Sequence, residues 1–241
     1  MYFNWNWCII IMYNLRLGGK RVRKFNFFCS LALVLFMTLL IITLGQNIAL
    51  RTSAGYTFYF NDTRVVDSLM VNYSNSEMSK EITSFMNSWR PDEFQVYDDT
   101  GYDLQDIFSD RDSDNMMAVK KAADISLILC LISLVITASI YIYFLRNNFK
   151  LVLRKRMWVT SALSAVIVIA ELILTKTSAG TAWLMNITGL EPLSENSALR
   201  ILLGGDFISM AGTFLAAYTI IAGAALFYLT WVLTKPPRIF F

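Results

Sequence analysis

Histidine is absent from this chain of 241 residues, and cysteine occurs only three times. Because histidine is the commonest general base near neutral pH and the commonest metal ligand, its absence removes both roles together. Zinc chemistry that depends on histidine or cysteine ligands is disfavoured for the same reason. We therefore expect no metal ion and no cofactor. All three cysteines, Cys8, Cys29 and Cys130, lie outside the polar segment 51–124, so no disulfide framework supports that segment.

Charged residues are also scarce, at 16% of the chain, while hydrophobic residues make up 56%. A typical soluble protein has about 25% and roughly 45–50% of these residues. The excess is concentrated in four apolar runs, each near the ~20 residues with which a helix crosses a bilayer. A run of this kind must satisfy its backbone polar groups internally, which a helix does. The predicted spans are residues 25–50, 125–145, 157–175 and 207–233. The expected fold is thus an all-α membrane bundle of four transmembrane helices.

Lysine and arginine occur mainly on one side of these spans. They are enriched in the N-terminal segment 1–24, in the loop 146–156 and in the tail 234–241, and none of the three contains an acidic residue. Positive charge is retained in the cytoplasm, so we expect a multi-pass protein of the cell membrane with both termini cytoplasmic. The net charge of +3 then averages two opposed faces and does not indicate nucleic-acid binding.

The start of the chain has two open questions. A cleaved signal peptide would also place basic residues before an apolar run, but this run is too long for a signal core, and a retained helix is favoured. Within residues 1–21, Trp5, Trp7, Cys8 and Ile9–Met12 form an apolar patch too short to span a membrane, and Leu17-Gly18-Gly19-Lys20 back-translates to a purine-rich ribosome-binding site just before Val22. We expect translation in a bacterial source to start at Val22, from a GTG codon.

Two segments are expected on the outer side, residues 51–124 and 176–206. The first has apolar residues at helical spacing in Val65–Tyr73 and again in Met78–Trp89, the latter preceded by a possible capping box of Ser74 and Glu77. Strand patterns follow at Glu93–Tyr97 and Tyr102–Phe108, around a strong turn signal. This order predicts a small α+β extracytoplasmic cap between transmembrane helices 1 and 2.

The segment that opens the second span carries a motif. It runs Phe108-Ser109-Asp110-Arg111-Asp112-Ser113-Asp114-Asn115-Met116-Met117-Ala118-Val119-Lys120. It resembles the signature Phe-Ser-x-Arg-Glu-x-x-His-Met-x-Asp-Val-Lys of a bacterial four-span membrane family that includes the lipoprotein intramolecular transacylases. A second segment, Asn186-Ile187-Thr188-Gly189-Leu190-Glu191-Pro192, is similar to the family's Asn-x-Trp-x-Leu-x-Pro but lacks its tryptophan. The motif positions of interest are Arg111, Asn115, Met116, Val119 and Lys120.

The resemblance implies transfer of an acyl chain, at the outer membrane face, from the glyceryl group of a lipoprotein's N-terminal cysteine to that cysteine's amino group. Such a transfer needs a base, an acid and donors for the oxyanion, and the family's histidines near the outer ends of spans two and three are the natural candidates. Here Asn115 replaces the motif histidine, Ala118 replaces the motif aspartate, and Lys176–Thr181 contains no histidine. An amide cannot accept a proton near neutral pH, so these departures indicate a non-catalytic relative.

Glu171 and Asp112 are the candidate catalytic residues if the chemistry survives without histidine. Glu171 lies about one turn from the outer end of the third span, where an ionisable group is a functional candidate. Its structural alternative is pairing with Lys176 or contact with the aqueous interface. Asp112 replaces the motif glutamate. With Asp110 and Asp114 it forms an acidic cluster that suits a helix start, with a divalent-cation site as the alternative.

Three classes of function follow. The first is a non-catalytic relative that binds a lipid or lipoprotein, or assists a partner membrane protein, at the outer face. The second is an acyltransferase that uses carboxylates, and the third is a small transporter or channel subunit. The expected partners are membrane lipids, bacterial lipoproteins or another membrane protein.

The nucleotide sequence tests the start at Val22. We expect a purine-rich AGGAGG-like run in the codons for Leu17–Lys20 and a GTG codon for Val22. A nucleotide sequence without that run would contradict the proposed start.

Overall fold

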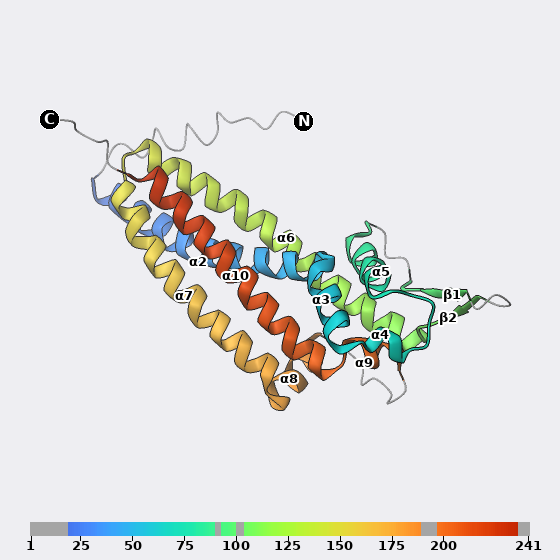
Figure 1. Ribbon diagram of the computed structural model, residues 1–241. Helices are drawn as coiled ribbons and strands as arrows, with labels where there is room; N and C mark the ends of the chain where they lie inside the picture. The colour runs from blue at the N-terminus through green and yellow to red at the C-terminus, as the bar shows by residue number, and fades with distance from the viewer. Residues whose placement is uncertain (1–18, 90–92, 100–103, 189–196, 236–241) are drawn as a thin grey trace.

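Four long helices form the body of the computed structural model (Figure 1), which describes residues 19–89, 93–99, 104–188 and 197–235. The expectations for residues 1–18 and for 189–192 fall outside these ranges. The long helices are α2 (Gly19–Arg51), α6 (Asp110–Arg146), α7 (Lys150–Lys176) and α10 (Gly205–Leu233). Each contains a stretch long and apolar enough to cross a membrane. The prediction of a multi-pass bundle of four transmembrane helices is confirmed.

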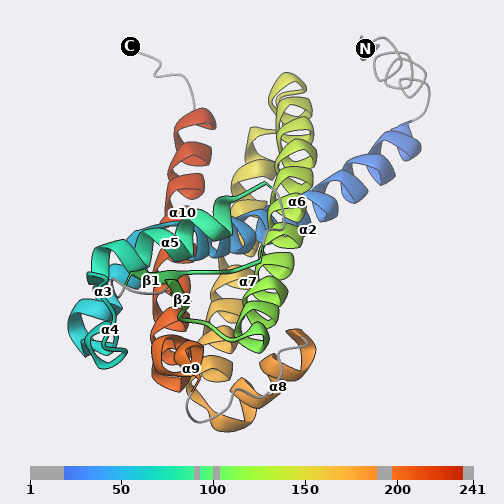
Figure 2. The ribbon, with the colours of Figure 1, turned by 90° about the vertical axis from the view of Figure 1, so that its right-hand side faces the viewer.

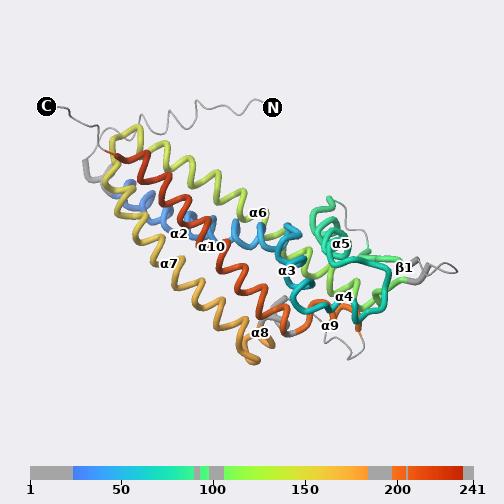
Figure 3. Tube along the Cα trace, viewed as in Figure 1, coloured from blue at the N-terminus to red at the C-terminus, as the bar shows by residue number. Residues whose placement is uncertain are grey.

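Helix α2 is the central helix of the bundle. It packs against α6, α7 and α10, whereas α6 and α7 touch each other much less. Half of its most apolar stretch is buried inside the protein, compared with 17–22% for the other three helices. Figure 2 shows α2 crossing the bundle at a tilt to the other long helices, and the tube in Figure 3 follows the same path. The first turns of α2 and the last turns of α10 lie at the same end of the bundle.

The segment between α2 and α6 folds into short elements, here called the α3–β2 region (residues 53–106). They are α3 (Ser53–Thr63), α4 (Val65–Ser68), α5 (Asn75–Asn87), β1 (Tyr97–Asp99) and β2 (Leu104–Asp106). The strands pair antiparallel, with Tyr97 opposite Asp106. The predicted capping box at the start of α5 is present: the Ser74 hydroxyl accepts from the Glu77 N–H, and the Glu77 carboxylate accepts from the Ser74 N–H.

The helices of this region differ from the prediction, whereas the predicted hairpin is present. A helix through Val65–Tyr73 was expected, but α4 ends at Ser68 and Met70 adopts a left-handed backbone with φ of 54°. Helix α3 was not anticipated; its aromatic side chains are buried against both α5 and α10, and Tyr56 stacks on Phe207. Strands β1 and β2 pair antiparallel on either side of the predicted turn, and β1 begins at Tyr97, the last residue of its predicted strand.

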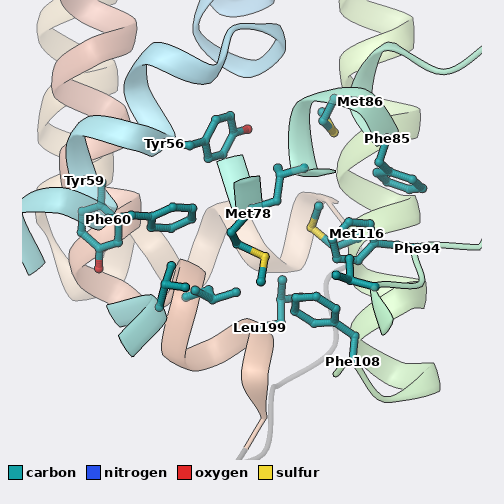
Figure 4. Close-up of a cluster of buried hydrophobic side chains, with 14 of the residues drawn as sticks. Tyr56, Tyr59, Phe60, Met78, Phe85, Met86, Phe94, Phe108, Met116 and Leu199 are labelled. Atoms are coloured by element: carbon teal, nitrogen blue, oxygen red, sulfur yellow. The ribbon is translucent and has the colours of Figure 1, made fainter. Parts of the chain in front are cut away.

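A hydrophobic cluster joins the α3–β2 region to the bundle (Figure 4). Its buried side chains come from α3, α5, the residues flanking the strands, the first turns of α6, and α9 (Ala198–Leu203). Helix α8 (Ser178–Thr188) connects α7 toward α9. The most enclosed members include Phe60, Val66, Met78, Met86 and Leu202, each with an exposed fraction of 0%. Because α6 contributes to this cluster and to the span, the α3–β2 region and the bundle share one continuous packing arrangement.

Close packing of α2 on α10 generates a stability prediction. A Cβ added at Gly45 would lie 2.9 Å from the backbone N and Cα of Thr219, too close for atoms that cannot move aside, and would also meet its hydroxyl. Gly45→Ala is therefore expected to destabilise the bundle by about 1–3 kcal/mol through overpacking, measured as a lower midpoint of unfolding in detergent.

Gly55→Ala is the matched control, since a Cβ there meets its nearest neighbour, the Phe214 ring, at 3.9 Å. This variant should unfold at or above the wild-type midpoint, because alanine favours a helix over glycine. Equal midpoints for the two variants would contradict the close contact.

Candidate functional site

Asp112 is a buried carboxylate whose two oxygens both accept hydrogen bonds. Its Oδ2 accepts from the Ser109 N–H at 3.2 Å, and its own N–H donates to the Ser109 hydroxyl, which makes a capping box at the start of α6. Its Oδ1 accepts from the Ser197 hydroxyl at 2.5 Å, and that hydroxyl accepts from the Arg200 N–H as the N-cap of α9. With 1% of its surface exposed, Asp112 joins the beginnings of α6 and α9.

Lys120 is a buried cation at the C-terminal end of α5. Its Nζ donates to the Phe85 carbonyl at 2.6 Å, to the Ser88 carbonyl at 2.7 Å and to the Ser88 hydroxyl. These three acceptors match the three donors of an ammonium group. The last carbonyls of a helix lack partners within the helix and carry the negative end of its dipole, so a cation stabilises them. Lys120, which is 2% exposed, thereby fixes the end of α5 against α6.

Arg51 holds the same end of α5 from the other side. Its Nη1 donates to the Met86 carbonyl at 2.5 Å, its Nη2 pairs with Asp124 at 2.5 Å, and its Nε donates to Asn47 at 3.2 Å. In the sequence, Arg51 marks only the boundary between the first span and the polar segment 51–124. Its partners lie 35 and 73 positions away along the chain, so no local pattern could have shown this role.

The remaining motif residues contribute mostly to packing. Met116 is buried in the hydrophobic cluster, and Val119 packs against it. Asn115, at the motif histidine position, is also buried, with 4% of its surface exposed, whereas Arg111 lies exposed in the first turn of α6. The motif face of α6 therefore lies largely inside the protein.

Glu171 ends a chain of hydrogen bonds that begins at Arg51. After the bond from Arg51 to Asn47, the Asn47 amide donates to the Ser126 hydroxyl at 3.2 Å, and that hydroxyl donates to the Gln46 Oε1 at 3.1 Å. The Gln46 Nε2 then donates to the Glu171 Oε1 at 3.4 Å. Every donor points from the guanidinium toward the carboxylate, so the bonds polarise one another in one direction.

The second oxygen of Glu171 is buried and has no hydrogen-bond partner among the described residues. The partner of this side chain is the Gln46 amide, rather than the Lys176 expected in the structural alternative. Three helices thus contribute to its environment: Gln46 comes from α2, Ser126 from α6 and Glu171 from α7. Buried polar groups normally have hydrogen-bond partners, which makes this oxygen the available acceptor of the site.

The two candidate catalytic carboxylates lie at different levels of the molecule. Glu171 is joined through Gln46 to Ser126 by hydrogen bonds. Ser126 follows Asp112 by 14 positions on α6. At 1.5 Å per residue, Asp112 and Ser126 lie about 21 Å apart along α6. The structure therefore does not bring Asp112 and Glu171 together, and one reaction centre cannot use both.

The acidic cluster at the start of α6 lines a surface cavity of about 90 Å³, to which Glu93, Asp106, Asp110 and Asp114 contribute. Within the part of the chain that the structure describes, no three cysteine or carboxylate side chains are arranged to hold a metal ion. Nothing there supports the divalent-cation alternative.

Three ionisable side chains of the α3–β2 region have shifted pKa values, namely Tyr56, Tyr59 and Glu77, and two of them form hydrogen bonds that fix local structure. Hydrogen bonds from the Ser74 hydroxyl and N–H lower the pKa of the Glu77 carboxyl. Burial raises the pKa of the Tyr56 hydroxyl well above its ordinary range, and this hydroxyl donates to the Leu50 carbonyl at 3.2 Å. Both groups support local structure and neither contacts the motif residues through these bonds.

Comparison with solved structures shows what this arrangement is similar to. The chain superimposes on the membrane-integral lipoprotein intramolecular transacylase Lit from Bacillus cereus with a TM-score of 0.68 and 12% identity, covering 87% of this chain and 96% of that one. A variant of that protein with a histidine replaced by arginine gives a TM-score of 0.69 at 11% identity, over 90% and 96% of the two chains. A variant with histidine replaced by alanine gives 0.68 at 11% identity, over 87% and 94%.

No family model matches the sequence, and no curated protein matches it. The predicted resemblance is confirmed at the level of the fold, which is what similarity at 11–12% identity shows. The chain has the fold of a lipoprotein intramolecular transacylase and contains no histidine.

The role of Lys120 gives a prediction with a matched neighbour. Lys120→Met removes three hydrogen bonds, to the Phe85 carbonyl and to the carbonyl and hydroxyl of the half-buried Ser88, which should cost about 1–3 kcal/mol. We expect faster amide hydrogen exchange throughout α5 and a lower unfolding midpoint. Lys121→Met changes the adjacent exposed lysine and should leave both quantities unchanged. Similar exchange in the two variants would show that Lys120 does not hold α5.

Proposed function

We propose that this protein is a non-catalytic relative of the lipoprotein intramolecular transacylases, with a lipid- or lipoprotein-binding or accessory role at the outer face of the bacterial plasma membrane. The observation that carries this proposal is the engagement of the polar motif side chains. Asp112 accepts hydrogen bonds on both oxygens, and Lys120 donates to three acceptors. In a chain without histidine, neither of these groups is free to move a proton.

The chemistry of acyl transfer explains why this matters. The amine must lose a proton to attack, and the departing alkoxide must gain one. Asn115, at the position of the motif histidine, has an amide that can hydrogen-bond but cannot accept a proton near neutral pH. The retained fold with these replacements favours recognition of a lipid or lipoprotein without transfer.

The proposed orientation rests on charge. The basic segment before α2, the basic loop between α6 and α7, and Lys235 after α10 would face the cytoplasm. The beginning of α2 and the end of α10 lie at the same end of the bundle, which fits two cytoplasmic termini. The α3–β2 region would then be an extracytoplasmic cap, placed where a lipoprotein's N-terminus emerges from the membrane.

The proposed ligands follow from the membrane setting and from the fold. The solved structures with this fold are of a protein named for acting on lipoproteins, so membrane lipids and bacterial lipoproteins are the first candidates, with a partner membrane protein as the third. We propose no role in nucleic-acid binding, because the basic segments adjoin membrane spans. We propose no cofactor.

Transacylation is tested directly in a bacterium that lacks both the intramolecular transacylase and the separate N-acyltransferase. The chain is expressed there, its presence in the membrane is confirmed, and lipoprotein N-terminal peptides are analysed by mass spectrometry. We expect the cysteine amine to stay free. Acylation of that amine would overturn the non-catalytic proposal.

Binding is tested on the same preparation by native mass spectrometry of the purified protein. We expect a retained lipid or diacylated lipoprotein that survives detergent exchange. A ligand-free protein after extraction in a mild detergent would count against a binding role.

A second candidate function is an acyltransferase that uses Glu171 as its base. The observation that favours it is the buried Oε2 of Glu171, which has no hydrogen-bond partner among the described residues. If the amine is acylated in the experiment above, Glu171→Gln should abolish the product, because an amide keeps the shape but not the basicity. Asp112→Asn is the comparison, since Asp112 lies about 21 Å along α6 from Ser126, the α6 residue of the hydrogen-bond chain that ends at Glu171. Replacement of Asp112 should lower stability rather than remove the base.

A further inference from the structure

Trp89 is the most exposed large hydrophobic side chain in the described structure, with 98% of its surface exposed. It follows Ser88, the residue that caps the C-terminal end of α5. Tryptophan has a large apolar ring and is highly buried on average, so full exposure of this ring in water is unfavourable. The position of Trp89 relative to the spans gives the reason for its exposure.

The backbone beside Trp89 is fixed at a known level of α6. The carbonyls of Phe85 and Ser88 accept from Lys120 of α6, and the carbonyl of Met86 accepts from Arg51 at the end of α2. The arginine in turn pairs with Asp124 of α6. Figures 1 and 2 both show α5 beside the part of α6 nearer its start. The end of α5 therefore lies level with residues 120–124 of α6.

The apolar surface of α6 begins immediately afterward. Ile125 and Ile128 are 60% and 56% exposed, and the exposed apolar side chains continue along the helix from there. Lys120 precedes Ile125 by five positions, which is about 7.5 Å along the helix. The hydrocarbon core of a bilayer is about 30 Å thick and the whole bilayer about 40–45 Å, which leaves roughly 5–8 Å of polar interface on each side. The end of α5 is thus at interfacial depth.

We infer that Trp89 inserts into the lipid headgroup region and anchors the end of α5 to the membrane surface. An indole ring suits this region because its body is apolar and its N–H can donate a hydrogen bond to a polar group. The buried Lys120 and the partly buried Arg51 hold the adjacent backbone, so the ring is presented from a fixed point rather than from a loose loop. This inference goes beyond the proposed function and does not depend on it.

Insertion of Trp89 fixes the position of the α3–β2 region on the bilayer surface. Helix α5 is attached to α6 through Lys120 and to α2 through Arg51, and Trp89 adds a contact with lipid at the same level. A cavity of about 180 Å³ beside this point, lined in part by Phe85, Ser88 and Glu93, is thereby held close to the lipid headgroups.

The test uses fluorescence from Trp89 alone. The other five tryptophans are changed to phenylalanine, which keeps an aromatic ring at each position: Trp5, Trp7, Trp158, Trp183 and Trp231. The full chain is placed in phosphatidylcholine vesicles with either ordinary or brominated acyl chains. We expect blue-shifted emission, at least a twofold loss of intensity in brominated vesicles, and weak quenching by aqueous acrylamide. Emission at the wavelength of free tryptophan, with strong acrylamide quenching and none by bromine, would overturn the inference.

The control moves the single tryptophan away from the membrane. In the same background, Trp89→Phe is combined with Asp114→Trp, an exposed position that precedes Ile125 by 11 residues and so lies about 16 Å further out along α6. This variant should be quenched by acrylamide and not by brominated lipid.

A second measurement keeps the test decisive if the five replacements impair folding. The protein with all its tryptophans is compared with its Trp89→Phe variant in brominated vesicles. Loss of Trp89 should remove part of the fluorescence that brominated lipid quenches. An unchanged quenched intensity would show that Trp89 does not contact lipid.

Discussion

The capping of α5 by two cations, the buried Lys120 and the partly buried Arg51, is the contact on which the arrangement of this protein depends. A helix that ends inside a protein exposes carbonyls that its own backbone cannot satisfy. Lys120 from α6 and Arg51 from α2 supply the donors, and their charges match the negative end of the helix dipole. Since an unpaired buried charge is far more costly than a paired one, cations and helix end stabilise each other only when the α3–β2 region is docked. The hydrophobic cluster shown in Figure 4 then packs against a helix α5 whose position is fixed.

Arg51 also connects this contact to the interior of the bundle. From its Nε, three further side chains carry hydrogen bonds to Glu171, and all of the donors face the same way. Polar groups at membrane depth are expensive unless they are satisfied, and the central position of α2 lets its Gln46 and Asn47 reach α6 and α7 together. The site around Glu171 and the docking of α5 therefore share one residue, although they serve different parts of the molecule.

The fold shared with the lipoprotein intramolecular transacylase is carried here by a chain that contains no histidine. The motif on α6 contains residues of two kinds. Asp112 and Lys120 hold α9 and α5 through hydrogen bonds, and Met116 fills the hydrophobic cluster, so the architecture needs all three. Asn115, which stands at the histidine position of the motif, is buried on the same helix. The packing of α6 in this chain therefore requires no histidine.

The sequence by itself determined the four spans, the helical start at Ser109 and the capping box at Ser74, because length, hydropathy and capping are local properties. It also singled out Asp112, Lys120 and Glu171, but not what they contact. Their partners are separated from them by 85, 35 and 125 positions, and only the crossing of α2 with α6 and α7 decides which side chains meet. The same applies to α3, whose apolar face is buried against both α5 and α10, and to the separation of Asp112 from Glu171. Tertiary structure decided these features because side-chain pairing across helices depends on helix register and tilt, which no local pattern specifies.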